Sequence, residues 1–122
     1  MPAMRQCWLL AAIVLAGCGT DPDPRRATTE VIVLEILQPN CGQAQCHSQA
    51  TQKAKEPGHS YAFDSIDRAL ESINTMGDAK LTGVLTGIDP DDERMPFDAP
   101  LNQQDIDLIS VWLRNGKPDQ TP

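Results

Sequence analysis

The strongest constraint in this sequence is a short stretch that contains two cysteines and a histidine, Cys41-Gly42-Gln43-Ala44-Gln45-Cys46-His47. Cys46 and His47 are adjacent, and four residues separate the two cysteines. Two thiols and an imidazole this close along a chain are typical of three structures: a disulfide, a pair of thioether bonds to a cofactor, or a set of metal ligands. The rest of the chain has to accommodate one of them.

The N-terminus has the features of an exported lipoprotein. Arg5 supplies a positive charge, residues 8–15 form a short apolar run, and the run ends in Leu15-Ala16-Gly17-Cys18. This run is too short to be a permanent transmembrane helix. We expect a signal peptide over residues 1–17 and a lipid on Cys18, which would hold the protein on the periplasmic side of a bacterial membrane. The alternative is an ordinary secretory signal, with Cys18 as a coincidental cysteine or a disulfide partner.

Cysteine usage and charge narrow the possibilities for the mature chain. Cys7 leaves with the signal, so Cys41 and Cys46 are the cysteines of the folded part, where an oxidising compartment would not keep two close thiols free. A mature chain of about 100 residues is the size of one domain. Acidic residues outnumber basic ones by 17 to 10, which argues against nucleic-acid binding and favours a partner with a basic face.

A polar linker precedes the domain. Residues 18–27 include two Asp-Pro pairs and no large apolar side chain, which predicts a flexible tether behind the lipid. The domain begins at residue 28, where Thr28 or Thr29 can cap a helix. The apolar run 31–37 follows and ends before Pro39, and its pattern fits either a helix or a buried strand.

Three later segments have helical patterns. Residues 65–75 carry apolar side chains at i, i+3, i+4 and i+7, with Asp64 as the expected cap and Met76-Gly77 at the end. Residues 80–85 predict a short helix. The last helix has Asn102 as its cap and Gly116 after its end, and its inward stripe consists of Ile106, Ile109, Trp112 and Leu113.

Read together with Met95-Pro96, the cysteine motif indicates a covalently bound haem. Two thiols can add across the vinyl groups at one edge of a haem, and His47 would then be carried under the ring as the proximal iron ligand. The usual spacing between such cysteines is two residues. Here the two additional residues can bulge outward, because the Cys46-His47 step is unchanged. Met95 is the expected distal ligand, with His59 and Met76 as alternatives.

This arrangement resembles the class I c-type cytochromes, in particular small bacterial lipoprotein members with a C-x4-C-H motif. The resemblance implies an all-α fold over residues 28–118, with three to four helices around one haem c, helix for residues 31–37, and Trp112 packed against that first helix. It implies an electron carrier and not an enzyme, with basic redox partners. Cys41 and Cys46 would hold the haem, and His47 and Met95 would ligate its iron. A family proline that orients the histidine has one candidate, Pro57.

Three other interpretations remain. A Cys41–Cys46 disulfide would make the chain a haem-free lipoprotein interaction domain. A zinc site would draw on the same two cysteines with His47 and His59, although adjacent ligands suit a tetrahedral site poorly. A haem with an open distal position would need His59 or Arg94 above the iron. The small number of aromatic residues favours a cofactor, because small domains often need one to remain folded.

Overall fold

A computed structural model of the chain describes residues 22–43, 46–50, 61–91 and 93–119. Its elements are the π-helix η1 (Val31–Leu37), α1 (Gln38–Cys41), α3 (Ile66–Met76), α4 (Asp78–Thr86) and α5 (Gln103–Arg114). These residues form helices and no strand, so the predicted all-α class is confirmed for them, and the 31–37 run is helical. No helix in the described ranges has the length and apolar character that a membrane span requires. The expected signal peptide and Cys18 lie outside these ranges.

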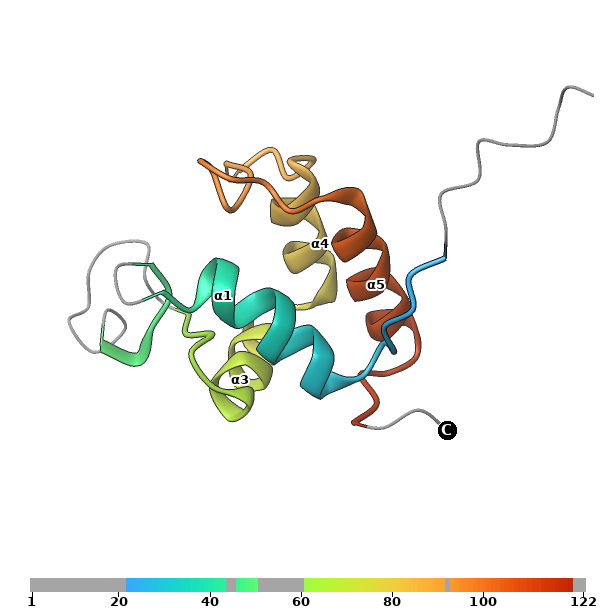
Figure 1. Cartoon of the computed structure of the whole chain (residues 1–122). Helices are drawn as coiled ribbons and strands as arrows, with labels where there is room; N and C mark the ends of the chain where they lie inside the picture. The colour runs from blue at the N-terminus through green and yellow to red at the C-terminus, as the bar shows by residue number, and fades with distance from the viewer. Residues whose placement is uncertain (1–21, 44–45, 51–60, 92, 120–122) are drawn as a thin grey trace, which may run out of the picture.

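The helices form a ring of contacts around one core. Helix η1 continues directly into α1, and η1 packs against both α3 and α5. Helix α4 closes the ring, because it also packs against α3 and α5 (Figure 1). Trp112 is fully buried at the centre of this core, as the sequence pattern predicts.

The π turn of η1 brings its buried side chains onto a narrower face of the helix than an α turn would. Its buried positions are Ile32, Val33, Ile36 and Leu37, and Cys41 follows at the end of α1. In an α-helix each residue turns by about 100° around the axis, so Cys41, nine residues after Ile32, would lie on the opposite side of the helix from Ile32. A π turn contains more residues, as the bond from Gln38 N–H to Val33 O shows. The wider turn therefore brings Cys41 back toward the core.

The ends of α3 and α4 are defined by a serine and two glycines. Ser65 caps α3 by accepting a hydrogen bond from Arg68 N, so the prediction that Asp64 is the cap was wrong. The Asp64 carboxylate instead accepts from Gln49 N at 2.9 Å and holds the chain that follows His47. Gly77 and Gly87, with φ of 89° and 73°, end α3 and α4.

The two ends of the domain are joined by hydrogen bonds around a buried threonine. Thr29 Oγ1 accepts a bond from Trp112 Nε1 at 3.2 Å, and Thr29 N donates to Pro118 O at 2.8 Å. Thr28, and not Thr29, accepts from Val31 N at the first turn of η1. At the start of α5, Asn102 accepts from Asp105 N, which confirms the predicted cap. The first and last helices are thus held together by polar as well as apolar contacts.

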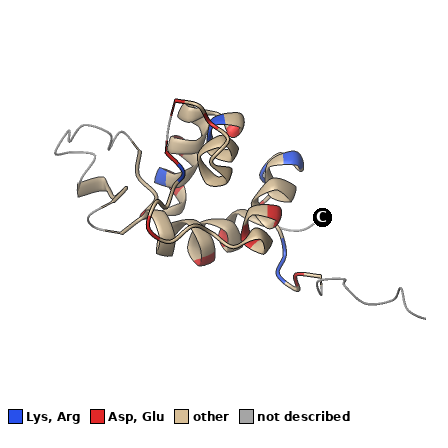
Figure 2. Ribbon diagram, turned by 90° about the horizontal axis from the view of Figure 1, so that it is seen from above, with Lys and Arg blue, Asp and Glu red and all other residues tan. Residues whose placement is uncertain are grey.

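Residues 22–27 lie against α5 through an ion-pair cluster. Arg25 contacts Asp23 at 2.7 Å and Asp105 in the first turn of α5 at 2.6 Å. Ala27 packs against the core. The described part of the predicted tether is therefore in contact with the domain. Figure 2 shows acidic residues distributed along the ribbon, with fewer basic residues between them.

Candidate functional site

The backbone of the cysteine motif closes into a compact loop. His47 N donates to Cys41 O at 2.9 Å, and Cys46 N donates to Gln43 O at 2.9 Å. Phe63 N then donates to His47 O at 2.7 Å, which joins the motif to the segment before α3. The four-residue spacing therefore still places the backbone of His47 beside that of Cys41.

Gly42 permits this loop because the Phe63 backbone passes directly over it. A Cβ atom on Gly42 would lie 2.5 Å from Phe63 O and 2.8 Å from Phe63 C. The φ of Gly42 is −83°, so the requirement for glycine is steric and does not come from an unusual backbone conformation. Sequence reasoning did not single out Gly42, and its position directly after Cys41 is the only signal that could have drawn attention to it.

The segment that covers His47 is held in place by a buried serine. Ser72 Oγ accepts from Ala62 N at 2.9 Å and donates to Ala62 O at 3.0 Å, and Ser72 is 4% exposed. This pair of bonds fixes the residues on either side of Ala62. One of them, Phe63, contacts the His47 ring edge to face, with ring centroids 5.9 Å apart. Ser72 therefore orients the aromatic side chain beside the imidazole, and the buried Nδ1 atom of His47 lies in this region.

A cavity of about 120 Å³ brings together three of the predicted haem residues. Cys41 and His47 come from the motif, and Met95 comes from the loop between α4 and α5. Most of the other lining side chains are apolar, with one lysine and one glutamate among them. The full lining consists of Cys41, His47, Tyr61, Phe63, Met76, Lys80, Leu81, Val84, Leu85, Glu93 and Met95.

Two methionines line this cavity. Met95 is held by its backbone, whose N–H donates to Val84 O in α4 at 2.9 Å. Met76 is the last residue of α3 and is named in the sequence analysis as an alternative ligand. Both thioether side chains are partly buried. The cavity therefore offers a thioether from two different elements of the fold.

Cys41 and Cys46 differ in their surroundings. Cys41 is buried and lines the cavity, whereas Cys46 is exposed and is not among the lining residues. Burial raises the pKa of the Cys41 thiol to about 12, with a smaller contribution from the nearby Cys46. Both residues are thiols in the structure, and no disulfide joins them. Burial therefore favours the protonated form of the Cys41 thiol at neutral pH.

Of the remaining residues considered for the haem site, only Arg94 is described by the structure, and it does not line this cavity. His59 and Pro57 lie outside the described residues. Arg94 is exposed, and its side chain packs near Gly87, where a Cβ would lie 3.2 Å from Arg94 Cβ. Within the described ranges, no three His, Cys, Asp or Glu side chains are grouped in a way that could hold a metal ion.

The residues around the cavity fit a covalently attached haem in their chemistry. A thiol, an imidazole and a thioether, which attach or ligate a c-type haem, meet at one largely apolar cavity. Tyr61 and Phe63 supply aromatic surface on the same wall. A porphyrin is larger than the enclosed volume, so part of the ring would lie outside it. Cys46, at the exposed end of the motif, is the second thiol available for attachment.

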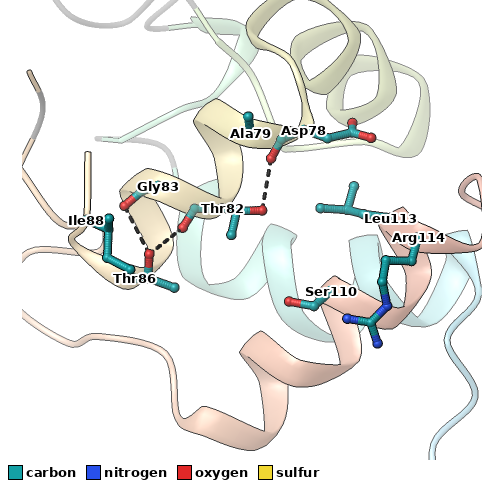
Figure 3. A pocket seen from close by; sticks show the side chains of 9 residues that line it. All are labelled: Asp78, Ala79, Thr82, Gly83, Thr86, Ile88, Ser110, Leu113 and Arg114. Atoms are coloured by element: carbon teal, nitrogen blue, oxygen red, sulfur yellow. Dashed lines mark hydrogen bonds between the residues drawn. The ribbon is translucent and has the colours of Figure 1, made fainter. Parts of the chain in front are cut away.

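A second hollow, of about 560 Å³, lies between α4 and α5 (Figure 3). Its hydroxyl groups are turned to backbone carbonyls: Thr82 donates to Asp78 O, and Thr86 donates to Thr82 O. Ser110 likewise donates to Ile106 O in α5. These side chains therefore satisfy their own helices, and the hollow contains none of the predicted haem residues.

Comparisons of the chain with protein-family models, with curated proteins and with solved structures find no match. The likeness to class I c-type cytochromes stays an expectation that depends on the cysteine motif and Met95. The residues around the 120 Å³ cavity are accordingly the basis for assigning a function.

Proposed function

We propose that this chain is an electron carrier with one covalently attached haem c. The observation that carries the proposal is that Cys41, His47 and Met95, which are chosen from sequence for three different haem roles, line the same cavity. Met95 is far from the motif in the sequence, so local chain geometry does not explain this meeting. Cys41 and Cys46 would hold the haem, His47 would be the proximal ligand, and Met95 the distal one.

The residues of the chain have separate tasks in this proposal. A haem with two axial protein ligands supplies reversible one-electron transfer at its iron. Phe63 fixes the imidazole plane of His47, and the apolar side chains Leu81 and Leu85 exclude water from the cavity. The Val84 carbonyl holds the backbone of Met95. Such a site keeps its ligands in place whether an electron is present or not.

The first test is an absorption spectrum of the mature domain after periplasmic expression with haem-attachment machinery, followed by a denaturing gel stained for haem. A sharp low-spin ferrous spectrum and a stained band are expected. A colourless protein with a Cys41–Cys46 disulfide would overturn the proposal and favour a haem-free lipoprotein interaction domain.

The attachment sites are tested by Cys41→Ala combined with Cys46→Ala. This double substitution is expected to leave no haem on the denatured band, because no thioether can form. Haem that still stains on that band would show that the attachment is elsewhere. The single Cys46→Ala variant tests whether the exposed thiol forms one of the two bonds.

The distal ligand is tested by a matched pair, Met95→Ala and Met76→Ala. Met95→Ala is expected to convert the iron to high-spin and lower its potential, because the thioether favours the ferrous state. Met76→Ala removes the other thioether of the cavity and is expected to leave the spectrum low-spin. The reverse result would assign the distal role to Met76.

The membrane attachment is a separate part of the proposal. It is supported by the signal-like N-terminus and by Cys18 after Leu15-Ala16-Gly17. Cys18→Ala is expected to release the domain from the membrane fraction into the soluble periplasmic fraction. Continued fractionation with the membrane would count against a lipid on Cys18 and would leave the haem proposal untouched.

A further inference from the structure

The loop between α4 and α5 exposes two large apolar side chains. Ile88 is 79% exposed and Phe97 is 72% exposed, and among the described residues the only other large exposed hydrophobic side chain is Leu34 on η1, at 41%. We call residues 88–91 and 93–98 the acidic loop. An isolated exposed apolar residue is common on protein surfaces, whereas two such exposures on one short loop favour a contact surface.

Hydrogen bonds and an ion pair hold the acidic loop in this conformation. Ile88 N and Asp89 N both donate to Gly83 O, at 3.0 and 3.3 Å, and Met95 N donates to Val84 O at 2.9 Å. Lys80 in α4 pairs with Asp89 at 3.0 Å. The loop is therefore attached to α4 at Ile88, Asp89 and Met95, and Ile88 and Phe97 are exposed in this conformation.

The charge of the acidic loop defines the partner that would fit it. Asp91, Glu93 and Asp98 are exposed, against one exposed arginine, Arg94. A second copy of this chain would bring like charges together, because the chain has a net charge of −7. The anionic headgroups of a membrane would be repelled in the same way. A protein with lysines or arginines around an apolar patch is complementary to the acidic loop both in charge and in its exposed apolar side chains.

The acidic loop is also next to the cavity. Glu93 and Met95, both in this loop, line the cavity that contains His47 and Cys41. A partner bound to Phe97, two residues beyond Met95, would therefore be close to a haem held in this cavity, whereas Ile88 lies at the edge of the loop that faces the hollow between α4 and α5. Small interfaces with an apolar centre and charged surroundings are typical of transient electron-transfer complexes.

We propose that the acidic loop is the docking surface for a basic redox protein, with Ile88 and Phe97 as its apolar contacts and Asp91 and Asp98 as its charged ones. The electron-transfer part of this inference depends on the proposed function, whereas the binding itself does not require haem. Replacing either apolar side chain with serine is expected to weaken binding by about three- to tenfold, because serine would bury little of the apolar area that Ile88 or Phe97 buries against the partner. Higher salt is expected to weaken binding further.

The test is an NMR titration of the ¹⁵N-labelled domain with a small, strongly basic c-type cytochrome as the probe. Shift changes are expected in residues 88–98. The dissociation constant is expected to rise in three variants: Ile88→Ser, Phe97→Ser, and the double variant Asp91→Asn with Asp98→Asn. The matched controls are Leu34→Ser on η1 and Asp67→Asn on α3, which leave the loop intact. Shift changes spread over α3 or η1, or equal weakening by the controls, would overturn the inference.

The same samples separate this inference from the proposed function. Stopped-flow mixing of the reduced domain with the oxidised probe measures electron transfer in the wild type and the loop variants. Binding at residues 88–98 by a domain that has no haem spectrum would refute the electron carrier and support the docking surface. A haem-loaded domain whose transfer rate is unchanged by Phe97→Ser and Asp91→Asn would refute the docking surface and support the electron carrier.

Discussion

Gly42→Ala is the substitution that tests the geometry of the cysteine motif most directly. It adds one methyl group at the point where the Phe63 backbone crosses the motif. The new Cβ would be 2.5 Å from Phe63 O, 2.8 Å from Phe63 C and 3.0 Å from Gln38 O. These neighbours are backbone atoms, so no side chain can rotate away to relieve the contact.

The magnitude follows from two opposing contributions. To restore an ordinary contact near 3.4 Å, one of the two backbones must move by about 0.9 Å, and overpacking of this kind costs about 1–3 kcal/mol. Alanine also reduces the entropy of the unfolded chain, which stabilises the fold by about 0.4–1 kcal/mol because Gly42 has a φ that alanine can adopt. The net expectation is a loss of about 1–2 kcal/mol in the free energy of unfolding.

The assay is urea denaturation of the domain, with the midpoint and slope both measured. The midpoint is expected to fall while the slope is unchanged, since the surface exposed on unfolding stays the same. Gly83→Ala in α4 is the matched control. Its Cβ would meet Asp89 Cβ at 3.1 Å and the Asp89 backbone only at 3.6 Å, which is a milder contact than at Gly42, and alanine is favoured in a helix by about 1 kcal/mol. Gly83→Ala is therefore expected to be neutral or stabilising.

A Gly42→Ala domain as stable as the wild type would refute this reasoning. It would mean that Phe63 does not lie against Gly42, and so that Phe63 N does not bond to His47 O. The edge-to-face contact between Phe63 and His47 would then be in doubt as well. Loss of stability in both glycine variants would instead indicate a general intolerance of added volume.

Three further predictions follow from individual contacts. Ser72→Ala leaves the buried N–H and C=O of Ala62 without their partner, and it is expected to lower the free energy of unfolding in urea by about 2–3 kcal/mol. The exposed cap variant Ser65→Ala is the control and is expected to lower it by about 1 kcal/mol. Equal losses would contradict the role of Ser72. In the haem-free domain, iodoacetamide at pH 8 is expected to label the exposed Cys46 well before Cys41, because a pKa of about 12 reduces the thiolate of Cys41 by about three orders of magnitude relative to an ordinary cysteine. Equal labelling by mass spectrometry would refute this. The hydrogen bonds from Arg25 lower the pKa of Asp23, so this contact stabilises the fold above the ordinary aspartate pKa and is lost as pH falls through the lowered value. Arg25→Gln is accordingly expected to flatten the dependence of Tm on pH below about pH 4, and an unchanged profile would show that the contact is absent in solution.

Helices and their ends were the most predictable part of the fold. The stripe in residues 65–75 and the Asn102 cap depend on neighbours three or four residues away, which the sequence shows directly. Both are present in the structure, as α3 and as the first turn of α5. The helical state of residues 31–37 was not decided by their pattern, because six of the seven residues are apolar and four are the β-branched Val or Ile, which suit a buried strand equally well.

The parts of the site that could not be predicted depend on contacts between distant segments. Met95 and its alternative Met76 were both named through their chemistry, but the sequence does not indicate that the two thioethers would line one cavity together. Gly42 and Ser72 act on Phe63 and Ala62, some ten to twenty residues away along the chain, and a single sequence contains no signal for such pairs. Asp64 was wrongly expected to be a cap, because its carboxylate bonds to Gln49 in the chain after the motif.

If Cys18 carries the proposed lipid, the ion pair between Arg25 and Asp105 limits the reach of the domain from the membrane. With Arg25 held on α5, the chain from an anchored Cys18 to Pro22 could extend by at most about 14 Å. The domain would then remain within a few water layers of the lipid surface, and its partners would have to approach it from the side. Breaking the Arg25 contact would release residues 22–26, up to Ala27 in the core, and lengthen that reach to about 30 Å, so in the proposed carrier this one ion pair would limit the distance between the domain and the membrane.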